Sequence, residues 1–89
     1  MLCRIQFRRD NNRAVVRLAG RLSAEQVPDL LEACGQTDEP PIIELDELVS
    51  ADAVGIDALH RIERKRAELV GLPEYLRLTL ETLTRERRR

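Results

Sequence analysis

Three carboxylates are the residues of this 89-residue chain best placed to do chemistry. Glu44 and Asp46 stand two positions apart, so on a strand they point to the same side, and Asp52 follows shortly after. Carboxylates that converge at the end of a strand can hold a divalent cation, because Ca²⁺ and Mg²⁺ prefer oxygen ligands. Carboxylates in such places are more often solvated or cap a helix, so we expect no metal site.

The histidine and the cysteines offer little catalytic chemistry. His60 is the single histidine, and we predict it among charged residues on the outer face of a helix, where it would not act as a general base. Cys3 and Cys34 lie far apart, and a zinc ribbon is excluded because it needs four ligands. We interpret them as two buried thiols, since the chain starts without a signal-peptide pattern. No glycine-rich phosphate loop is present, so the sequence predicts no enzyme and no cofactor.

Composition excludes further classes of function. The 15 basic and 16 acidic residues give a net charge of -1, and Phe7 and Tyr75 are the only aromatic residues, which argues against nucleic-acid binding. The apolar fraction of 43% is typical of a soluble domain, and no apolar run approaches the roughly 18 residues that a transmembrane helix needs. We expect one cytoplasmic domain over residues 1–89, with a frayed charged tail at Arg85–Arg89.

The first half of the chain carries patterns for two strands, a helix and a third strand, over residues 3–8, 13–19, 23–35 and 42–46. Polar and apolar residues alternate in the first two segments, and Asp10-Asn11-Asn12 between them predicts a hairpin turn. Ser23 and Gln26 fit a capping box, although Pro28 requires the helix to bend or to begin late. A strand–helix–strand unit predicts that the second and third strands are parallel.

A second helix is expected from Asp52, a natural N-cap, to about Lys65. Its spacing predicts that one side faces the core, with Val54, Gly55, Ala58, Leu59 and Ile62. The other side is predicted to carry Ala53, Ile56, Asp57, His60 and Arg64.

The last third of the chain has two interpretations. Residues 61–70 continue the second helix, or residues 67–71 form a fourth strand followed by a third helix. In a third helix, one face would carry Leu72, Leu76, Leu80 and Leu83. Against a third helix, apolar and polar residues also alternate over residues 76–80, which fits a strand. Leu78 separates helix from strand there, because it shares a face with Leu76 and Leu80 only in a strand.

Two segments resemble the STAS domain, which is found in anti-sigma factor antagonists and in the cytoplasmic tails of sulfate transporters. Residues 14–25 (AVVRLAGRLSAE) contain a strand that ends in Gly-Arg-Leu, and residues 42–55 (IIELDELVSADAVG) end on an Asp-x-x-Gly step like that opening the family's second helix. Residues 67–73 look like the family's last strand and turn, although Arg66 stands where many members have Gly. The implied fold is α/β, with a four-stranded mixed sheet in the order β-β-α-β-α-β-α and helices packed on it.

In the antagonists of this family, the Ser or Thr after the Asp is phosphorylated by the partner kinase. Ala53 occupies that position here and has no hydroxyl. Ser50 does not align with the acceptor, and we interpret it as a solvated loop residue. We therefore expect no regulatory phosphorylation within residues 50–56.

The resemblance implies a protein-binding module in transcription regulation whose partner is an anti-sigma factor or a related regulatory kinase. The implied surface consists of Asp52, Ala53, Ile56, Asp57, His60 and Arg64, with Ile56 as the apolar anchor. Three alternatives stay open: a constitutive subunit that binds the ATPase of a membrane transport complex, a nucleotide or small-ligand binder that uses the end of the third strand, and a homodimer.

Overall fold

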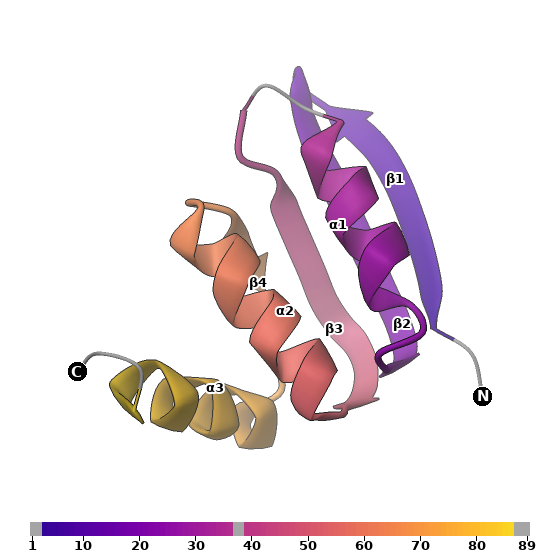
Figure 1. The fold of residues 1–89 in the computed structure, drawn as a ribbon. Coiled ribbons are helices and arrows are strands. Elements are labelled where there is room, and N and C mark those ends of the chain that lie inside the picture. Colours follow the sequence, from indigo (N-terminus) through magenta and orange to yellow (C-terminus); the bar gives the residue numbers. More distant parts are fainter. Residues whose placement is uncertain (1–2, 37–38, 87–89) are drawn as a thin grey trace.

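A four-stranded sheet carries helices on one of its faces (Figure 1). The computed structural model describes residues 3–36 and 39–86, with side chains as far as Thr82. The elements are β1 (Arg4–Asp10), β2 (Arg13–Leu22), α1 (Val27–Gly35), β3 (Ile42–Ala51), α2 (Ala53–Arg64), β4 (Glu68–Val70) and α3 (Glu74–Glu86). The strands lie in the order β1-β2-β3-β4, antiparallel for the first pair and parallel for the other two. The predicted α/β fold with a mixed sheet is confirmed.

The turn between β1 and β2 follows directly from its two asparagines. Asn11 and Asn12 have φ angles of 51° and 67°, and Asp10 pairs with Arg13 across the two-residue loop. Positive φ at both central residues is the geometry of a type I′ hairpin turn, which matches the twist of the strands, and Asn tolerates it well.

Helix α1 begins later than its capping pattern suggests. The Gln26 N–H donates to the Ser23 carbonyl over 3.0 Å, and the Gln26 side chain accepts from the Ser23 N–H over 3.3 Å. Both bonds lie in a turn before the helix, which starts at Val27. Pro28 then falls in the first turn, where its missing N–H leaves no helical bond unmade.

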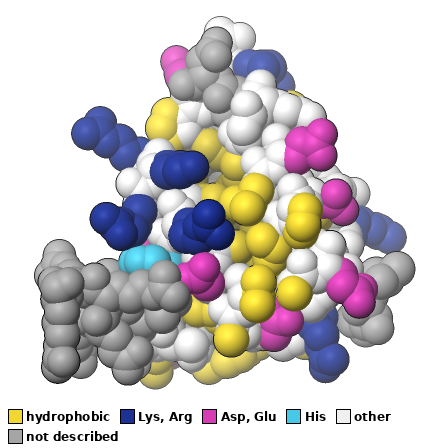
Figure 2. All heavy atoms as spheres, viewed as in Figure 1, with side chains coloured by type: hydrophobic (Ala, Val, Ile, Leu, Met, Phe, Trp, Pro, Cys, Tyr) yellow, Lys and Arg dark blue, Asp and Glu magenta, His cyan; other side chains and the backbone are white. Residues whose placement is uncertain are grey.

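The core lies between the sheet and the two helices α1 and α2. Its most enclosed side chains are 0% exposed and come from β2, β3, α1 and α2, namely Val16, Leu18, Leu22, Ile43, Leu45, Leu30 and Leu59. Full burial of such a side chain contributes about 1.5–3 kcal/mol. Figure 2 shows that hydrophobic side chains continue to the surface in a strip between α1 and α2, with basic side chains on the α2 side. A groove of about 300 Å³ there is lined in part by Leu31, Cys34 and Ile62.

The C-terminal segment is a strand followed by a helix. β4 pairs with β3 through Ile42↔Glu68, Ile43↔Leu69 and Glu44↔Val70. In α3, the residues Leu76 and Leu80 are 3% and 4% exposed, whereas Leu78 is 57% exposed, as a helix requires. Leu72 is also buried, and the side chain of Leu83 lies outside the described residues. Among the described residues, no helix combines the length and the apolar character needed to cross a membrane.

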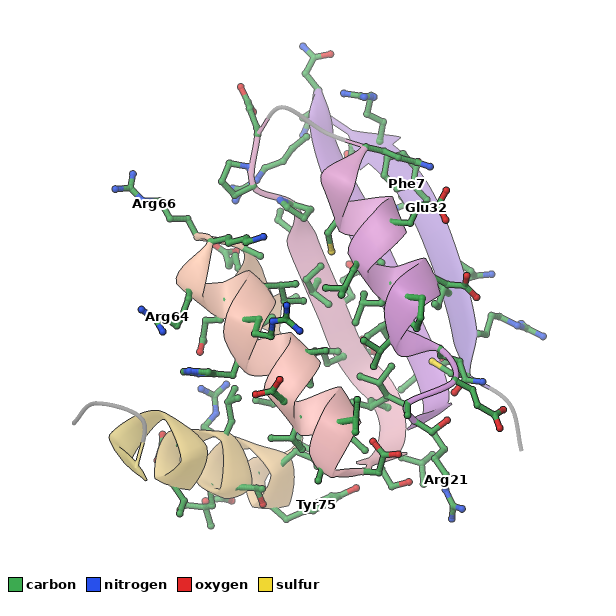
Figure 3. The ribbon with its side chains drawn as sticks, in the orientation of Figure 1. Phe7, Arg21, Glu32, Arg64, Arg66 and Tyr75 are labelled. Carbon is green, nitrogen blue, oxygen red and sulfur yellow. The ribbon has the colours of Figure 1, made fainter. Side chains whose placement is uncertain are left out.

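Arg66 has a backbone conformation that favours glycine. Its φ is +74°, in the left-handed region, immediately after α2 ends, and Figure 3 shows its side chain extending away from the fold. The Ala67 N–H then donates to the Ile62 carbonyl over 3.1 Å, which closes the end of the helix. A side chain in this conformation costs about 1–2 kcal/mol relative to glycine.

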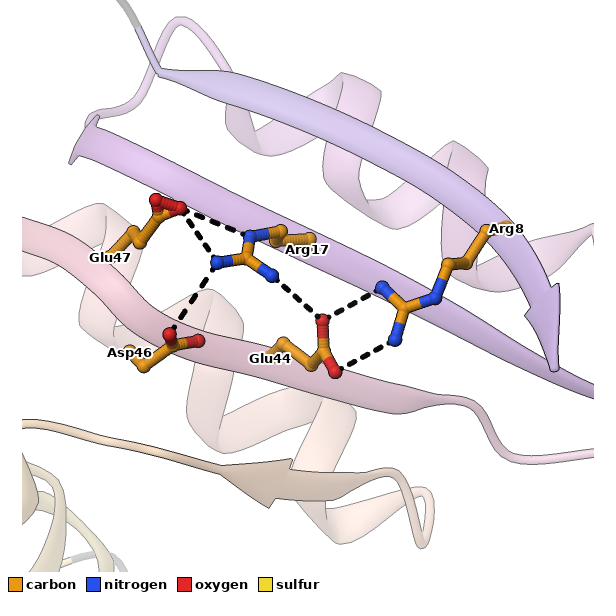
Figure 4. A network of polar contacts seen from close by, with 5 residues as sticks. All are labelled: Arg8, Arg17, Glu44, Asp46 and Glu47. Atoms are coloured by element: carbon orange, nitrogen blue, oxygen red, sulfur yellow. Dashed lines mark hydrogen bonds and ion pairs between the residues drawn. The ribbon is translucent and has the colours of Figure 1, made fainter.

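The sheet face opposite α1 and α2 carries an ion-pair network (Figure 4). Arg8 of β1 donates to both oxygens of Glu44 on β3, over 2.8 and 2.9 Å. Arg17 of β2 pairs with Glu47 at 2.7 Å and with Glu44 and Asp46 at 3.5 Å. Val15 lies between these strands on the same face and is only 3% exposed, because the Arg8–Glu44 pair spans it. The hydrogen bond from Arg8 holds the pKa of Glu44 below its ordinary value.

We predict that Leu80→Ala lowers the free energy of unfolding by about 2–5 kcal/mol, because it opens a cavity beneath α3. Leu78→Ala is the matched control, since the same atoms are removed from an exposed position, and it should cost little. Urea denaturation of the two variants measures the difference. Comparable losses at both positions would contradict a helix here.

We predict that Glu44 makes stability depend on pH in the acid range. Its folded pKa lies below the ordinary value of 4.5, so its contribution is present above about pH 4.5 and is lost as the pH falls through the folded pKa. Glu44→Gln should be less stable than the wild type at neutral pH and should lose less stability on acidification. Denaturation curves at a series of pH values check this, and parallel losses in the two proteins would refute it.

Candidate functional site

Asp52 joins three segments at the end of the molecule where α2 begins. Its Oδ1 accepts from the Gly55 N–H over 2.7 Å, which caps α2 as predicted. Its Oδ2 accepts from the Ala24 N–H over 3.1 Å, and its own N–H donates to the Leu22 carbonyl over 3.0 Å. One residue therefore holds the end of β2, the turn before α1 and the first turn of α2 together.

Gly55 is required by close packing at the same point. A Cβ at this position would lie 2.7 Å from the Leu22 carbonyl oxygen and 3.1 Å from the Leu22 Cγ. The first contact is with backbone, which cannot move aside without displacing the end of β2. The spacing of Asp52 and Gly55, which the resemblance singled out, thus has a structural cause in the docking of α2 on β2.

Ala53 is exposed at the first position of α2. It presents a methyl group and no hydroxyl at this position. Ser50 is half-buried, and its hydroxyl accepts from Arg21 Nε over 3.2 Å. Ser50 is therefore engaged with the neighbouring strand, and the interpretation of Ser50 as a solvated loop residue is wrong because β3 extends to Ala51.

The predicted outer face of α2 is wrong at two positions. Ile56 and His60 are 6% and 3% exposed, whereas Val54, predicted in the core, is 48% exposed. The cause is that α2 is covered from two sides, by the sheet and by α3, so its buried arc is wider than one apolar stripe (Figure 1). Ile56 therefore belongs to the core and cannot serve as a docking anchor.

The other four residues of the predicted surface are exposed or half-buried. Asp52, Ala53 and Arg64 are exposed, and Asp57 is half-buried. Arg64 stands at the far end of α2, about 16 Å along the axis from Ala53 at 1.5 Å per residue. The structure thus keeps Asp52 and Ala53 together and separates Arg64 from them.

Exposed apolar side chains occur near Ala53 in the chain, at Val49 and Val54, and on Tyr75, which is bonded to Val49; sequence reasoning missed them. Val49, Val54 and Tyr75 are 62%, 48% and 53% exposed and come from β3, α2 and α3. The Tyr75 hydroxyl donates to the Val49 carbonyl, and Figure 3 shows Tyr75 extending from α3 toward the start of α2. Tyr75 is one of only two aromatic residues in the sequence, and this could have marked it as a candidate contact residue. Val49 was hidden because the strand pattern ends before it.

The chemistry considered from the sequence finds little support in the geometry. Glu44 and Asp46 do share a side of β3, where both bond Arg17, while Asp52 is engaged as a cap. Within residues 3–36 and 39–82, no three His, Cys, Asp or Glu side chains are grouped to hold a metal. Cys3 and Cys34 are half-buried thiols that form no disulfide with each other, and desolvation raises the pKa of both.

We predict that Gly55→Ala destabilises the domain by about 1–3 kcal/mol, because the new methyl group overlaps the Leu22 carbonyl. Gly35→Ala is the control, since a Cβ there would meet nothing within 4 Å. Thermal melts of the two variants provide the comparison. A Gly55→Ala protein as stable as the wild type would show that α2 does not dock as described.

Comparison with known proteins identifies the fold. No family model and no curated protein matches the chain. An uncharacterized protein of the DUF3478 family from Shewanella loihica PV-4, described as having a SpoIIAA-like fold, is 15% identical with a TM-score of 0.54, and the match covers 91% of this chain and 75% of that one. The crystal structure of Mglu is 15% identical with a TM-score of 0.58, and the match covers 72% of this chain but only 18% of Mglu. At these identities the likeness concerns the fold alone, and the chain is an α/β domain with a SpoIIAA-like, STAS-like fold.

Proposed function

We propose that this chain is a protein-binding module whose contact surface surrounds the start of α2. The observation that carries the proposal is the exposure of three apolar side chains: Val49 and Val54, which flank the start of α2 in the chain, and Tyr75, which is bonded to Val49. Large apolar side chains exposed together on a small domain are typical of interaction sites, and aromatic residues are frequent anchors.

The partner we propose is an anti-sigma factor or a related regulatory kinase in the cytoplasm, and the module would act in transcription regulation without catalysing a reaction. The STAS-like fold and the Asp-x-x-Gly step support this choice. Because Ala53 has no hydroxyl, a kinase cannot switch the interaction off at this position. Binding is therefore constitutive or set by the abundance of the two proteins.

The charges near this surface have a different role from the apolar group. Asp52 directs its carboxylate to the backbone of Ala24 and Gly55, so it shapes the surface rather than reaching for a partner. Arg64 lies at the far end of α2, about 16 Å from Ala53, and is not part of this surface. Most of the binding free energy would come from Val54 and Tyr75.

We predict that Val54→Asp weakens binding by about 30-fold, equivalent to about 2 kcal/mol, because it places a charge within a dry contact. The melting temperature should hardly change, since Val54 is exposed. The measurement starts with capture from native cells, continues with identification of the retained protein, and ends with affinities for that purified protein. Retention of a transporter ATPase in place of a sigma regulator would replace the proposed partner by the transport alternative.

Two further variants make this test specific. Glu32→Ala changes an exposed residue of α1 and should bind like the wild type. Ile56→Asp places a charge in the core and should unfold the domain, which separates a loss of fold from a loss of contact. Unchanged binding by folded Val54→Asp protein would place the partner surface elsewhere.

A further inference from the structure

The open face of the sheet is mainly basic on β1 and β2 and acidic on β3 and β4, apart from Asp10 at the end of β1, which lies opposite Arg13 in the hairpin. Strands β1 and β2 contribute Arg4, Arg8 and Arg17 to it, and β3 and β4 contribute Glu44, Glu47 and Glu68. Glu68 belongs to this face because it pairs with Ile42, whose neighbour Ile43 points into the core. No described helix covers these residues, as Figure 4 shows for the region of the ion pairs.

The cross-strand register places these residues in rows that run from β1 to β4. When a second copy of a row is laid over the first in the opposite order, the charges that meet are opposite in sign. One row reads Arg8, Val15, Ile42, Glu68 from β1 to β4. Read in reverse, it places a carboxylate opposite the arginine and an apolar side chain opposite each apolar side chain. The next row reads Gln6, Arg17, Glu44, Val70 and sets Arg17 opposite Glu44 when reversed.

We propose that this face is the interface of a homodimer whose two-fold axis runs parallel to the strands. Rotation about that axis keeps each row in place and reverses its order, so the basic half of one copy meets the acidic half of the other. Arg8 then faces Glu68 of the second copy, and Arg17 faces Glu44. An axis across the strands in the sheet plane would instead stack β1 on β1 and β4 on β4, which sets like charges opposite each other.

Within a single copy, Arg8 and Glu68 keep hydrogen-bonding groups that can bind a second copy. Arg8 uses two of its five N–H donors on Glu44, and within the described part of the chain Glu68 makes no ion pair. Val15 is covered by the Arg8–Glu44 pair within each copy, so the contact between copies is made by the charged side chains and by Ile42.

The area of the face sets the strength of the dimer. The strands have 7, 10, 10 and 3 residues, so at about 3.3 Å per residue and about 4.8 Å between strands they cover about 480 Å² on each copy. Two copies bury about 950 Å², which is below the range of stable specific interfaces and typical of weak, transient contacts. The dimer is accordingly weak and sensitive to salt, and it leaves the start of α2 free on both copies. It therefore stands independently of the proposed function.

Sedimentation velocity tests the dimer and its symmetry. In about 0.05 M salt and at high protein concentration, the wild type should have a sedimentation-derived mass of twice 10.2 kDa. In about 0.5 M salt the dimer should dissociate to monomers. Glu68→Arg alone and Arg8→Glu alone should each weaken self-association at least tenfold, because each sets like charges opposite one another at two places. An equimolar mixture of the two variants should form a heterodimer. In that pair the two introduced side chains face each other with opposite charges, and the native Arg8 of one copy meets the native Glu68 of the other.

Two control variants separate a loss of the dimer contact from other effects of changing a charge. Arg64→Glu reverses an exposed charge on α2 and should dimerise like the wild type. If Arg8→Glu does not fold, as judged by circular dichroism, Arg8→Ala replaces it and must also shift the protein toward monomer. A monomeric wild type in low salt overturns the proposal. So do a folded Glu68→Arg protein that still dimerises and a mixture of folded variants that stays monomeric.

Discussion

The contact between the end of β2 and the first turn of α2 is the constraint on which the rest of the site depends. The Leu22 carbonyl accepts from the Asp52 N–H and lies against Gly55, where any Cβ would approach it to 2.7 Å. The carboxylate of Asp52 completes the junction through the backbone of Ala24 and Gly55. Because this junction fixes where α2 starts, it also fixes Ala53 and Val54 at the surface and directs Ile56 into the core.

The molecule consequently presents two surfaces of different character. The end around Ala53 is apolar, with Val49, Val54 and Tyr75 exposed, and the open sheet face is charged and partly neutralised by its own ion pairs. An apolar end on a rigid helix start suits a protein partner of high affinity. A charged face of modest area suits a weaker, salt-dependent contact. Val54 of the apolar end lies on α2, on the other side of the sheet from Arg8 and Glu44 of the charged face.

Local patterns predicted the elements well because their causes are local. The asparagine turn, the strand alternation and the cap at Asp52 are each set by residues close together in sequence. The face of α2 was wrong at Ile56 because α2 is covered by α3 as well as by the sheet, and only the folded chain brings α3 against it. The strand at Glu68–Val70 is three residues long, too short for a periodic signal, and its pairing with β3 decides its structure. The Arg8–Glu44 pair joins residues on strands that are not adjacent, so no spacing in the sequence indicates it.

The central claim is that a partner protein binds around the start of α2. Amide chemical shifts of the isotope-labelled chain, recorded during titration with the protein captured from native cells, test this most directly. The account predicts that the largest changes fall on residues 49–54 and on Tyr75, with little change around Leu31 and Cys34 in the groove at the other end of α1. Changes confined to that groove or to the open sheet face would contradict it.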